Sequence, residues 1–253
     1  LRFAHDEHWH TYWKNPGTGL PTALEWKLPP GWTAGEIQWP APSLLHDSRS
    51  TIVGNGYEGE LFLPVTLTPP ASLVPGSSVT LAASADWLMC EDVCIPGSAE
   101  LSLTLPVSAT TPAADPSWGE KIRTTLAGLP RPDPAWKISA TRNAGTIELA
   151  ITPSGASGYS PKDAHFFSED DLVAYDQPQS VRPDGRGGFV LALKVSPDGP
   201  TDAKQLIGVV TSENGWLAGG QLRGLQVNAD FTGTPAGSGS QISNLKPESG
   251  GLA

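Results

Sequence analysis

Short runs of alternating apolar and polar residues recur along most of the chain. A period of two is typical of β-strands with one buried face, so extended segments are predicted, most of them bounded by Pro or Gly. Residues 43–59 are instead predicted as a loop, because Gly54, Gly56 and Gly59 form a strong turn signal. The predicted strands are 1–4, 24–28, 36–39, 60–68, 78–85 and 99–107 in the first half, and 136–141, 146–152, 165–167, 188–195, 205–211 and 224–231 in the second.

One segment between the two groups of strands has the features of a helix. Asp115 is placed to cap it and Pro116 suits its first turn, while Gly128 is placed to end it. The segment before it, 108–117, is rich in Ser, Ala, Thr and Pro. We therefore predict a linker that contains one short helix.

Composition supports an all-β protein. The 253 residues include 25 prolines and 28 glycines, which forbid long helices and suit short strands joined by turns. The spacing of the later strands is typical of a second β-sandwich. The expected organisation is a first domain at 1–108, a linker at 109–130, a second sandwich at 131–233 and a flexible tail at 234–253.

Charge and hydropathy exclude two classes of function. The formal net charge is -10, and no Lys/Arg cluster longer than a dipeptide occurs, so no nucleic-acid partner is expected. No run approaches the roughly 18–20 apolar residues that span a bilayer. Because the chain opens on a strand-like pattern without an initiator Met, we interpret it as a processed or excised piece.

The candidate chemistry lies in the only two cysteines, Cys90 and Cys94. Four positions along an extended strand span roughly 13 Å, whereas a disulfide needs Cα atoms about 4.4–6.8 Å apart. The intervening residues must therefore turn the chain back, and we expect the end of a hairpin. So small a ring gains little loop-closure entropy, but it keeps a resolving thiol close at hand. We interpret the pair as a redox centre, slow without a docked partner because Glu91 and Asp92 raise the thiol pKa.

Three alternatives stay open on the residues alone. In the first, the disulfide is purely structural and takes no part in redox exchange. In the second, His5, His8 and His10 bind copper together with Met89 or the thiols. In the third, the Trp-rich N-terminal third lines a carbohydrate cleft. No motif for hydrolysis or phosphate binding is present, and no cofactor is expected.

Several motifs together resemble the periplasmic N-terminal region of the DsbD-like transmembrane thiol:disulfide reductases. The similarity is greatest to their ScsB branch, which is linked to copper tolerance and related to cytochrome c biogenesis. It is specific over about residues 8–107 and looser from 130 to 231. The motifs are HTYWKNPG (10–17), GLP (19–21), EIQWP (36–40), YEG (57–59), LPV (63–65) and WLMCEDVCIPG (87–97).

This resemblance implies an immunoglobulin-like fold and a role for each cysteine. Cys94 matches the family cysteine that forms the mixed disulfide with partners, and Cys90 matches its resolving mate, although their spacing is shorter here than in the best-known member. The family shields the pair with a cap loop, here about residues 50–57. The candidates for cover or access are Tyr57, Ile52, Val53 and Trp87.

The resemblance also implies a location and partners. The chain would be the periplasmic, soluble portion of an inner-membrane protein. It would receive electrons from the membrane-embedded electron-transfer domain of the same protein by way of a thioredoxin-like domain. It would pass them to a thioredoxin-fold periplasmic protein.

Overall fold

The structure, a computed structural model, describes residues 1–155, 160–220 and 222–232. Within them the predicted all-β, immunoglobulin-like fold with one short helix is confirmed. The predicted tail at 234–253 lies outside the described residues, and the division into domains stays a prediction. The strands before the helix are β1 (Arg2–Ala4), β2 (His10–Tyr12), β3 (Ala23–Lys27), β4 (Thr33–Ile37), β5 (Ser43–His46), β6 (Ile52–Glu58), β7 (Glu60–Phe62), β8 (Val65–Thr68), β9 (Ser78–Cys90) and β10 (Cys94–Pro106).

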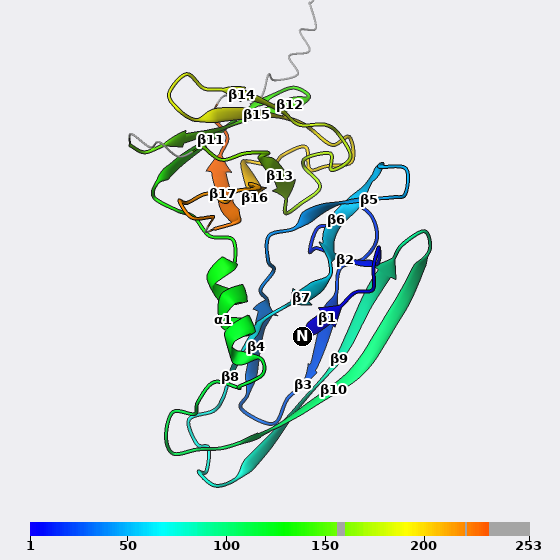
Figure 1. The fold of residues 1–253 in the computed structure, drawn as a ribbon, viewed down its shortest axis with the longest axis vertical. Coiled ribbons are helices and arrows are strands. Elements are labelled where there is room, and N and C mark those ends of the chain that lie inside the picture. Colours follow the sequence, from blue (N-terminus) through cyan, green and yellow to red (C-terminus); the bar gives the residue numbers. More distant parts are fainter. Residues whose placement is uncertain (156–159, 221, 233–253) are drawn as a thin grey trace, which may run out of the picture.

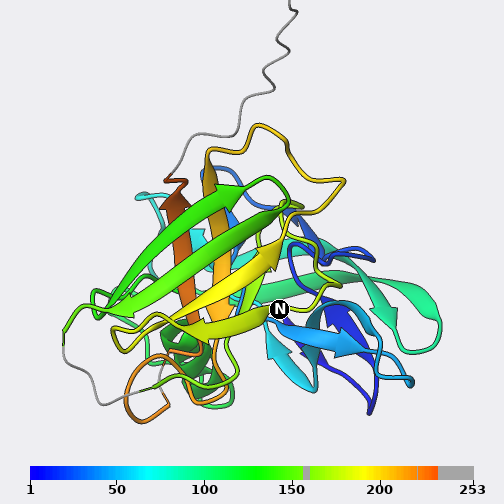
Figure 2. The same ribbon diagram turned by 90° about the horizontal axis from the view of Figure 1, so that it is seen from above.

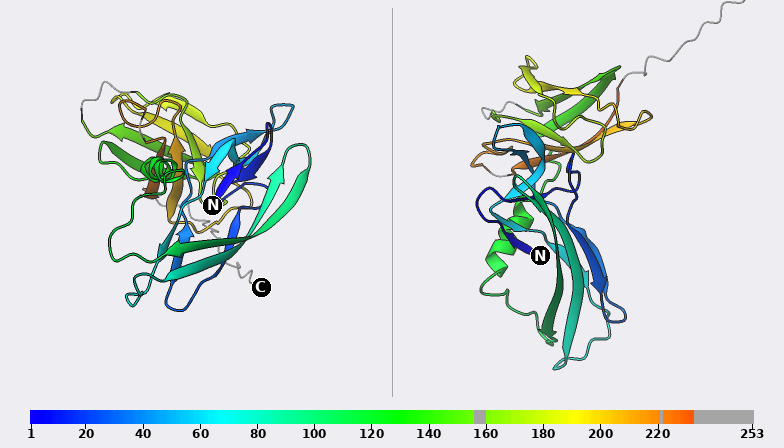
Figure 3. Two further views of the ribbon diagram at one scale, coloured as in Figure 1. Left: turned by 60° about the horizontal axis from the view of Figure 1, so that its bottom comes forward. Right: turned by 90° about the vertical axis from the view of Figure 1, so that its right-hand side faces the viewer.

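The first half is built around the long β9–β10 hairpin. Its two strands pair along all 13 residues of each, and the sheet continues in the order β10-β9-β2-β6-β5, with β3 also on β9. Figure 3 shows this hairpin running the length of the lower half of the molecule. Alternate residues of β9, namely Leu81, Ala83 and Ala85, are buried, as the period-two pattern predicts. Two small sheets, β1–β7 and β4–β8, complete this half.

The prediction of a loop at 43–59 is wrong. These residues include β5 and β6, which pair with a bulge near His46. Gly54 and Gly56 permit close approach rather than a turn. A Cβ on Gly56 would lie 2.1 Å from the carbonyl oxygen of Thr11, on the neighbouring strand β2, and Gly54 has a φ of 152°. Glycine is favoured at such positions because it lacks a Cβ.

The predicted helix is confirmed as α1 (Gly119–Gly128), beside β4 and β8 in Figure 1. Asp115 precedes it, and its side-chain oxygen accepts hydrogen bonds from the backbone N–H groups of Ser117 and Trp118 at 2.8 and 2.9 Å. Helical structure therefore begins three residues later than Pro116, the predicted first position. No helix in the described residues is long and apolar enough to cross a membrane.

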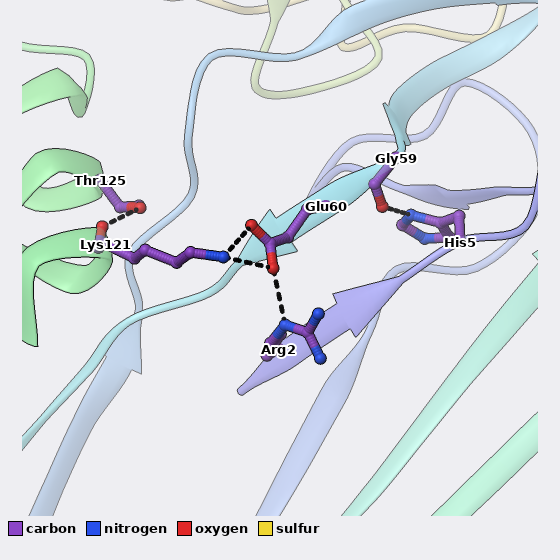
Figure 4. Close-up of polar contacts among 6 residues, drawn as sticks. All are labelled: Arg2, His5, Gly59, Glu60, Lys121 and Thr125. Atoms are coloured by element: carbon purple, nitrogen blue, oxygen red, sulfur yellow. Dashed lines mark hydrogen bonds and ion pairs between the residues drawn. The ribbon is translucent and has the colours of Figure 1, made fainter. Parts of the chain in front are cut away.

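An ion-pair cluster ties α1 to the first half of the chain. Lys121 of α1 donates hydrogen bonds to both carboxylate oxygens of Glu60 at 2.9 and 2.8 Å, and Arg2 of β1 donates to the same carboxylate at 2.9 Å. Figure 4 shows Glu60 between the two basic side chains. The hydrogen bonds from Lys121 and then Arg2 lower the pKa of Glu60.

Glu60→Gln is expected to lower the melting temperature slightly at pH 7 and to lower it less near pH 3. A carboxyl whose pKa is lowered in the folded state stabilises the fold above its unfolded pKa, and that contribution is lost as the pH falls through the folded pKa. The effect is small because the cluster is exposed. Thermal melts of the variant and of Glu36→Gln, an exposed control on β4, measure it. An equal deficit at both pH values would contradict the assignment.

The second half is a sandwich of two sheets. A four-stranded sheet, β11-β12-β15-β14, lies over a three-stranded sheet, β13-β16-β17 (Figure 2). Ile147, Leu149 and Ile151 of β12 are fully buried between them, as their alternation predicts. β14 was not predicted, because all four of its residues are exposed. The strands are β11 (Trp136–Asn143), β12 (Thr146–Pro153), β13 (His165–Ser168), β14 (Ser180–Pro183), β15 (Phe189–Lys194), β16 (Gln205–Thr211) and β17 (Gly224–Asp230).

The two halves share a buried apolar cluster. Trp13, which directly follows β2, is 1% exposed and contacts Phe167 of β13 edge-on, with ring centroids 6.2 Å apart. The next two residues extend this junction. Lys14 forms a 2.6 Å ion pair with Glu169, and the Asn15 amide donates to the Ser168 carbonyl at 3.1 Å. The second half therefore holds the segment that leaves β2.

Candidate functional site: the disulfide at the end of the β9–β10 hairpin

The two cysteines lie opposite each other at the end of the β9–β10 hairpin. Cys90 ends β9 and Cys94 begins β10; they are direct partners in the strand register and are joined by a disulfide, with Cα atoms 4.1 Å apart. The turn between them is closed by a hydrogen bond from the Glu91 N–H to the Val93 carbonyl at 3.2 Å. The predicted hairpin end is thereby confirmed. The other register pairs of these strands do not involve the disulfide, so opening the bond is expected to leave the sheet paired.

The two sulfurs differ in access. Cys94 is exposed, and its neighbours Val93 and Ile95 are 63% and 46% exposed. Cys90 is only 2% exposed and packs in a cluster with Tyr12 and Leu45. A sulfur atom of another protein can therefore reach Cys94, whereas Cys90 is shielded from it.

Tyr12 of β2 is a site residue that the sequence did not single out. Its hydroxyl lies 3.9 Å from the Cys94 sulfur and donates a hydrogen bond to it, because a disulfide sulfur has no hydrogen of its own to donate. The ring is buried, and the chain passes so close to it at Gly19 that a Cβ there would lie 2.5 Å from the ring. Tyr12 and Cys94 are 82 positions apart in the sequence, so only the strand pairing brings them together.

Of the four predicted cover residues, two lie on the β5–β6 hairpin near the disulfide and two do not lie near it. Val53 of β6 packs against the cluster that contains Cys90, and Ile52 lies opposite His46 in the β5–β6 hairpin. Figure 1 shows this hairpin and the β9–β10 hairpin ending on the same side of the molecule. Part of the predicted cap segment therefore does lie at the disulfide.

Trp87 and Tyr57 are not brought to the disulfide. Trp87 is three positions from Cys90 on one strand, so its side chain points to the opposite face of the sheet; there it contacts Phe3 edge-on at 5.2 Å. Tyr57 pairs with Thr11, whereas Cys90 pairs with His10, the residue before Thr11. Because neighbouring residues of a strand point to opposite faces of the sheet, Tyr57 also faces away from the disulfide. Its hydroxyl donates to the Pro40 carbonyl at 2.7 Å. Of the predicted cover residues, Val53 packs against Cys90, and the aromatic residue that does so is Tyr12 rather than Trp87 or Tyr57.

Tyr12→Phe is expected to slow alkylation of Cys94 in the reduced protein. The tyrosine hydroxyl can donate to the Cys94 thiolate and so favours ionisation. Loss of a hydrogen bond worth about 1 kcal/mol corresponds to a roughly fivefold lower rate near neutral pH. The measurement is the pH dependence of iodoacetamide reaction with reduced protein. Tyr57→Phe, which loses a hydroxyl on the other face, is the matched control; equal slowing in both variants would contradict the role of Tyr12.

The three N-terminal histidines do not share one environment. Both ring nitrogens of His5 are engaged, with the Gly59 carbonyl at 2.7 Å and the Thr11 hydroxyl at 3.0 Å. His8 is exposed, with a φ of 70°, and His10 is buried on β2. Among the described residues, no three or more His, Cys, Asp or Glu side chains are placed to hold a metal ion. The copper alternative therefore gains no ligand set from them.

Comparison with known proteins identifies the domain that carries the disulfide. No curated protein sequence matches the chain. The fold is similar to the crystal structure of the N-terminal periplasmic domain of ScsB from Proteus mirabilis, with a TM-score of 0.63 and 19% identity, over 92% of this chain and 87% of that one. This similarity establishes a shared fold that extends through both halves. Residues 1–106 match the family described as thiol:disulfide interchange protein DsbD, N-terminal. This chain therefore carries, in those residues, a DsbD-type N-terminal domain of the thiol:disulfide interchange family.

Proposed function

We propose that this chain relays reducing equivalents in the periplasm by dithiol–disulfide exchange at Cys90 and Cys94. The observation that carries the proposal is the asymmetry of the disulfide: an exposed Cys94 is bonded to a buried Cys90, at the end of a hairpin whose other register pairs do not involve the bond. A staple that only held the fold together would gain little from so small a ring. An accessible sulfur with a shielded partner instead suits exchange.

In the direction proposed, the reduced domain gives electrons to a partner disulfide. The Cys94 thiolate attacks one partner sulfur, which forms a mixed disulfide and releases the other partner sulfur as a thiolate. Cys90 then loses its proton, and its thiolate attacks the Cys94 sulfur. This step closes the Cys90–Cys94 disulfide and releases the second partner sulfur. The partner gains two electrons and the domain loses two.

The surroundings of Cys94 favour a partner that docks before it reacts. Val93 and Ile95 present apolar side chains on both sides of it, which suits the apolar surface around the disulfide of a thioredoxin-fold protein. Glu91 and Asp92 in the turn are exposed carboxylates, and a negative charge near a thiol disfavours the thiolate. Slow reaction with small disulfides and faster reaction with a docked protein are therefore expected.

We propose that the electrons come from the membrane-embedded domain of the same protein. In the proposed cycle, a thioredoxin-like domain reduces the Cys90–Cys94 disulfide by attack on Cys94, after receiving electrons from the membrane-embedded domain of the same protein. The support is the family of residues 1–106. Residues 1–108 would act as the redox domain and residues 131–233 as a second sandwich that braces it.

Cys90→Ala is expected to trap a mixed disulfide between Cys94 and a thioredoxin-fold partner in periplasmic extract. Without Cys90 the mixed disulfide is not resolved, so it accumulates and is detected as a shifted band on a non-reducing gel. Cys94→Ala is the matched control and is expected to trap little, because Cys90 is shielded. Trapping by Cys94→Ala alone would reverse the roles of the two cysteines, and trapping by neither would contradict the relay.

A further inference from the structure

His10 is a buried histidine beside the disulfide, and none of the contacts described so far uses its side chain. It lies on β2 directly opposite Cys90 of β9 in the strand register. Its side chain is 3% exposed, and its Nε2 atom has no hydrogen-bond partner among the described residues. An imidazole nitrogen that is buried without a partner costs free energy, so its presence beside the disulfide calls for an explanation.

The surroundings of His10 suit a neutral ring with its proton on Nδ1. The backbone of His8 favours the protonated ring, as a nearby carbonyl oxygen does, and Nε2 is the atom without a partner among the described residues. With the proton on Nδ1, the neutral ring holds a free lone pair on Nε2. Burial is the main cause that lowers the pKa of His10. At pH 7 the ring is therefore neutral and able to accept a proton.

His10 borders a cavity at the disulfide turn. His10, Glu58 of β6 and the turn residues Glu91 and Asp92 all line this cavity. The His10 ring also contacts Tyr12 edge-on, with centroids 5.3 Å apart, and Tyr12 in turn contacts Cys94. Side chains of directly opposed residues have Cβ atoms about 4.5–5.5 Å apart, so a Cys90 thiol released from the disulfide is within reach of His10, directly or through one water.

We propose that His10 is the general base for Cys90 in the resolving step. This proposal rests on the exchange function proposed above. When Cys94 is in a mixed disulfide, Nε2 of His10 takes the proton from the Cys90 thiol. The Cys90 thiolate attacks the Cys94 sulfur, the new S–S bond forms, and the partner sulfur leaves with the electron pair. The imidazolium then returns its proton to the leaving thiolate or to water, so protons and electrons balance.

Two charged groups act on the proton affinity of His10. Glu58, its partner on β6, raises the pKa, and His5 lowers it. The cavity is also lined by His46 and Asp47 from the β5–β6 hairpin, by His8 from the segment before β2, and by Glu91 and Asp92. Because the pKa of His10 lies below the ordinary histidine value of about 6.5, the neutral ring is lost, and the resolving step slows, only at a more acidic pH than that.

The test separates the two steps with dithiodipyridine, a neutral chromogenic disulfide. Reduced protein releases one chromophore when Cys94 attacks and a second when Cys90 resolves. His10→Gln is expected to leave the first phase unchanged and to slow the second about 100-fold near pH 7. His46→Gln, a change in an exposed histidine of the same cavity, is the matched control and is expected to leave both phases unchanged.

Each remaining outcome has one meaning. Wild-type rates in His10→Gln, equal slowing of both phases, or the same loss in His46→Gln would overturn the role of His10. Should His10→Gln fail to fold, the wild-type pH profile decides. A second-phase rate that stops rising once the pH exceeds a pKa of less than 6.5 supports His10 as the base. A second-phase rate that rises tenfold per pH unit through pH 7 overturns it. Release of no chromophore by folded, reduced wild-type protein would instead contradict the proposed exchange function.

Discussion

Cys94→Ala is expected to lower the rate at which the reduced protein opens an external disulfide by about 1000-fold. In this variant the remaining thiol belongs to Cys90, which is 2% exposed. A reagent reaches it only after the hairpin end opens locally, and an opening that costs on the order of 4 kcal/mol reduces the reactive population about 1000-fold. The reaction of dithiodipyridine with reduced protein measures this rate.

Cys90→Ala is the matched control for this experiment. It keeps the exposed Cys94 and is expected to release one chromophore at close to the wild-type rate, without the second phase. Circular dichroism establishes that both variants keep the strands. Similar rates for the two variants would show that the burial of Cys90 does not control access, and the assignment of Cys94 as the attacking residue would then be wrong.

Trp13→Ala is expected to lower the free energy of unfolding by about 3–5 kcal/mol, as removal of a large buried aromatic residue does. Trp13 is 1% exposed and lies where β2 meets the second half, against Phe167. Its loss leaves a cavity in the cluster that both halves share. Urea unfolding followed by circular dichroism measures the change.

Trp13→Phe is the graded control, since it keeps an aromatic ring at the same contact and is expected to lose less than half as much. The indole N–H of Trp13 has no hydrogen-bond partner among the described residues, so its removal costs nothing in hydrogen bonding. Because Trp13 directly follows Tyr12, the alanine variant should also disturb the contact between Tyr12 and Cys94. A change in stability below about 1 kcal/mol for Trp13→Ala would contradict a shared core.

The parts of the fold that local patterns determine were predictable. The strand at Gln205–Thr211 has the predicted bounds, and the cysteine hairpin followed from the geometry that a short disulfide requires. The error at 43–59 arose because Gly54 and Gly56 serve close packing against β2 and the loop that follows it. Glycine in a turn and glycine under a neighbouring strand look alike in the sequence.

The candidate site was predictable only in its cysteines and part of its cap. Tyr12 and His10 depend on the pairing of β2 with β9, which joins residues about 80 positions apart. One signal was available: His10 and Tyr12 are two apart and so share a face of the same strand. Nothing in the sequence indicates that this face meets the disulfide, because strand register across such a distance is decided by the packing of the whole sheet.

The most direct test of the central claim is a redox equilibrium of the folded, wild-type protein. Samples in glutathione buffers of graded potential are alkylated and analysed by mass spectrometry, with circular dichroism recorded in parallel. The account predicts that the Cys90–Cys94 disulfide opens and closes reversibly in mild thiol buffers while the strand signal stays constant. A disulfide that remains closed until the protein unfolds would contradict it.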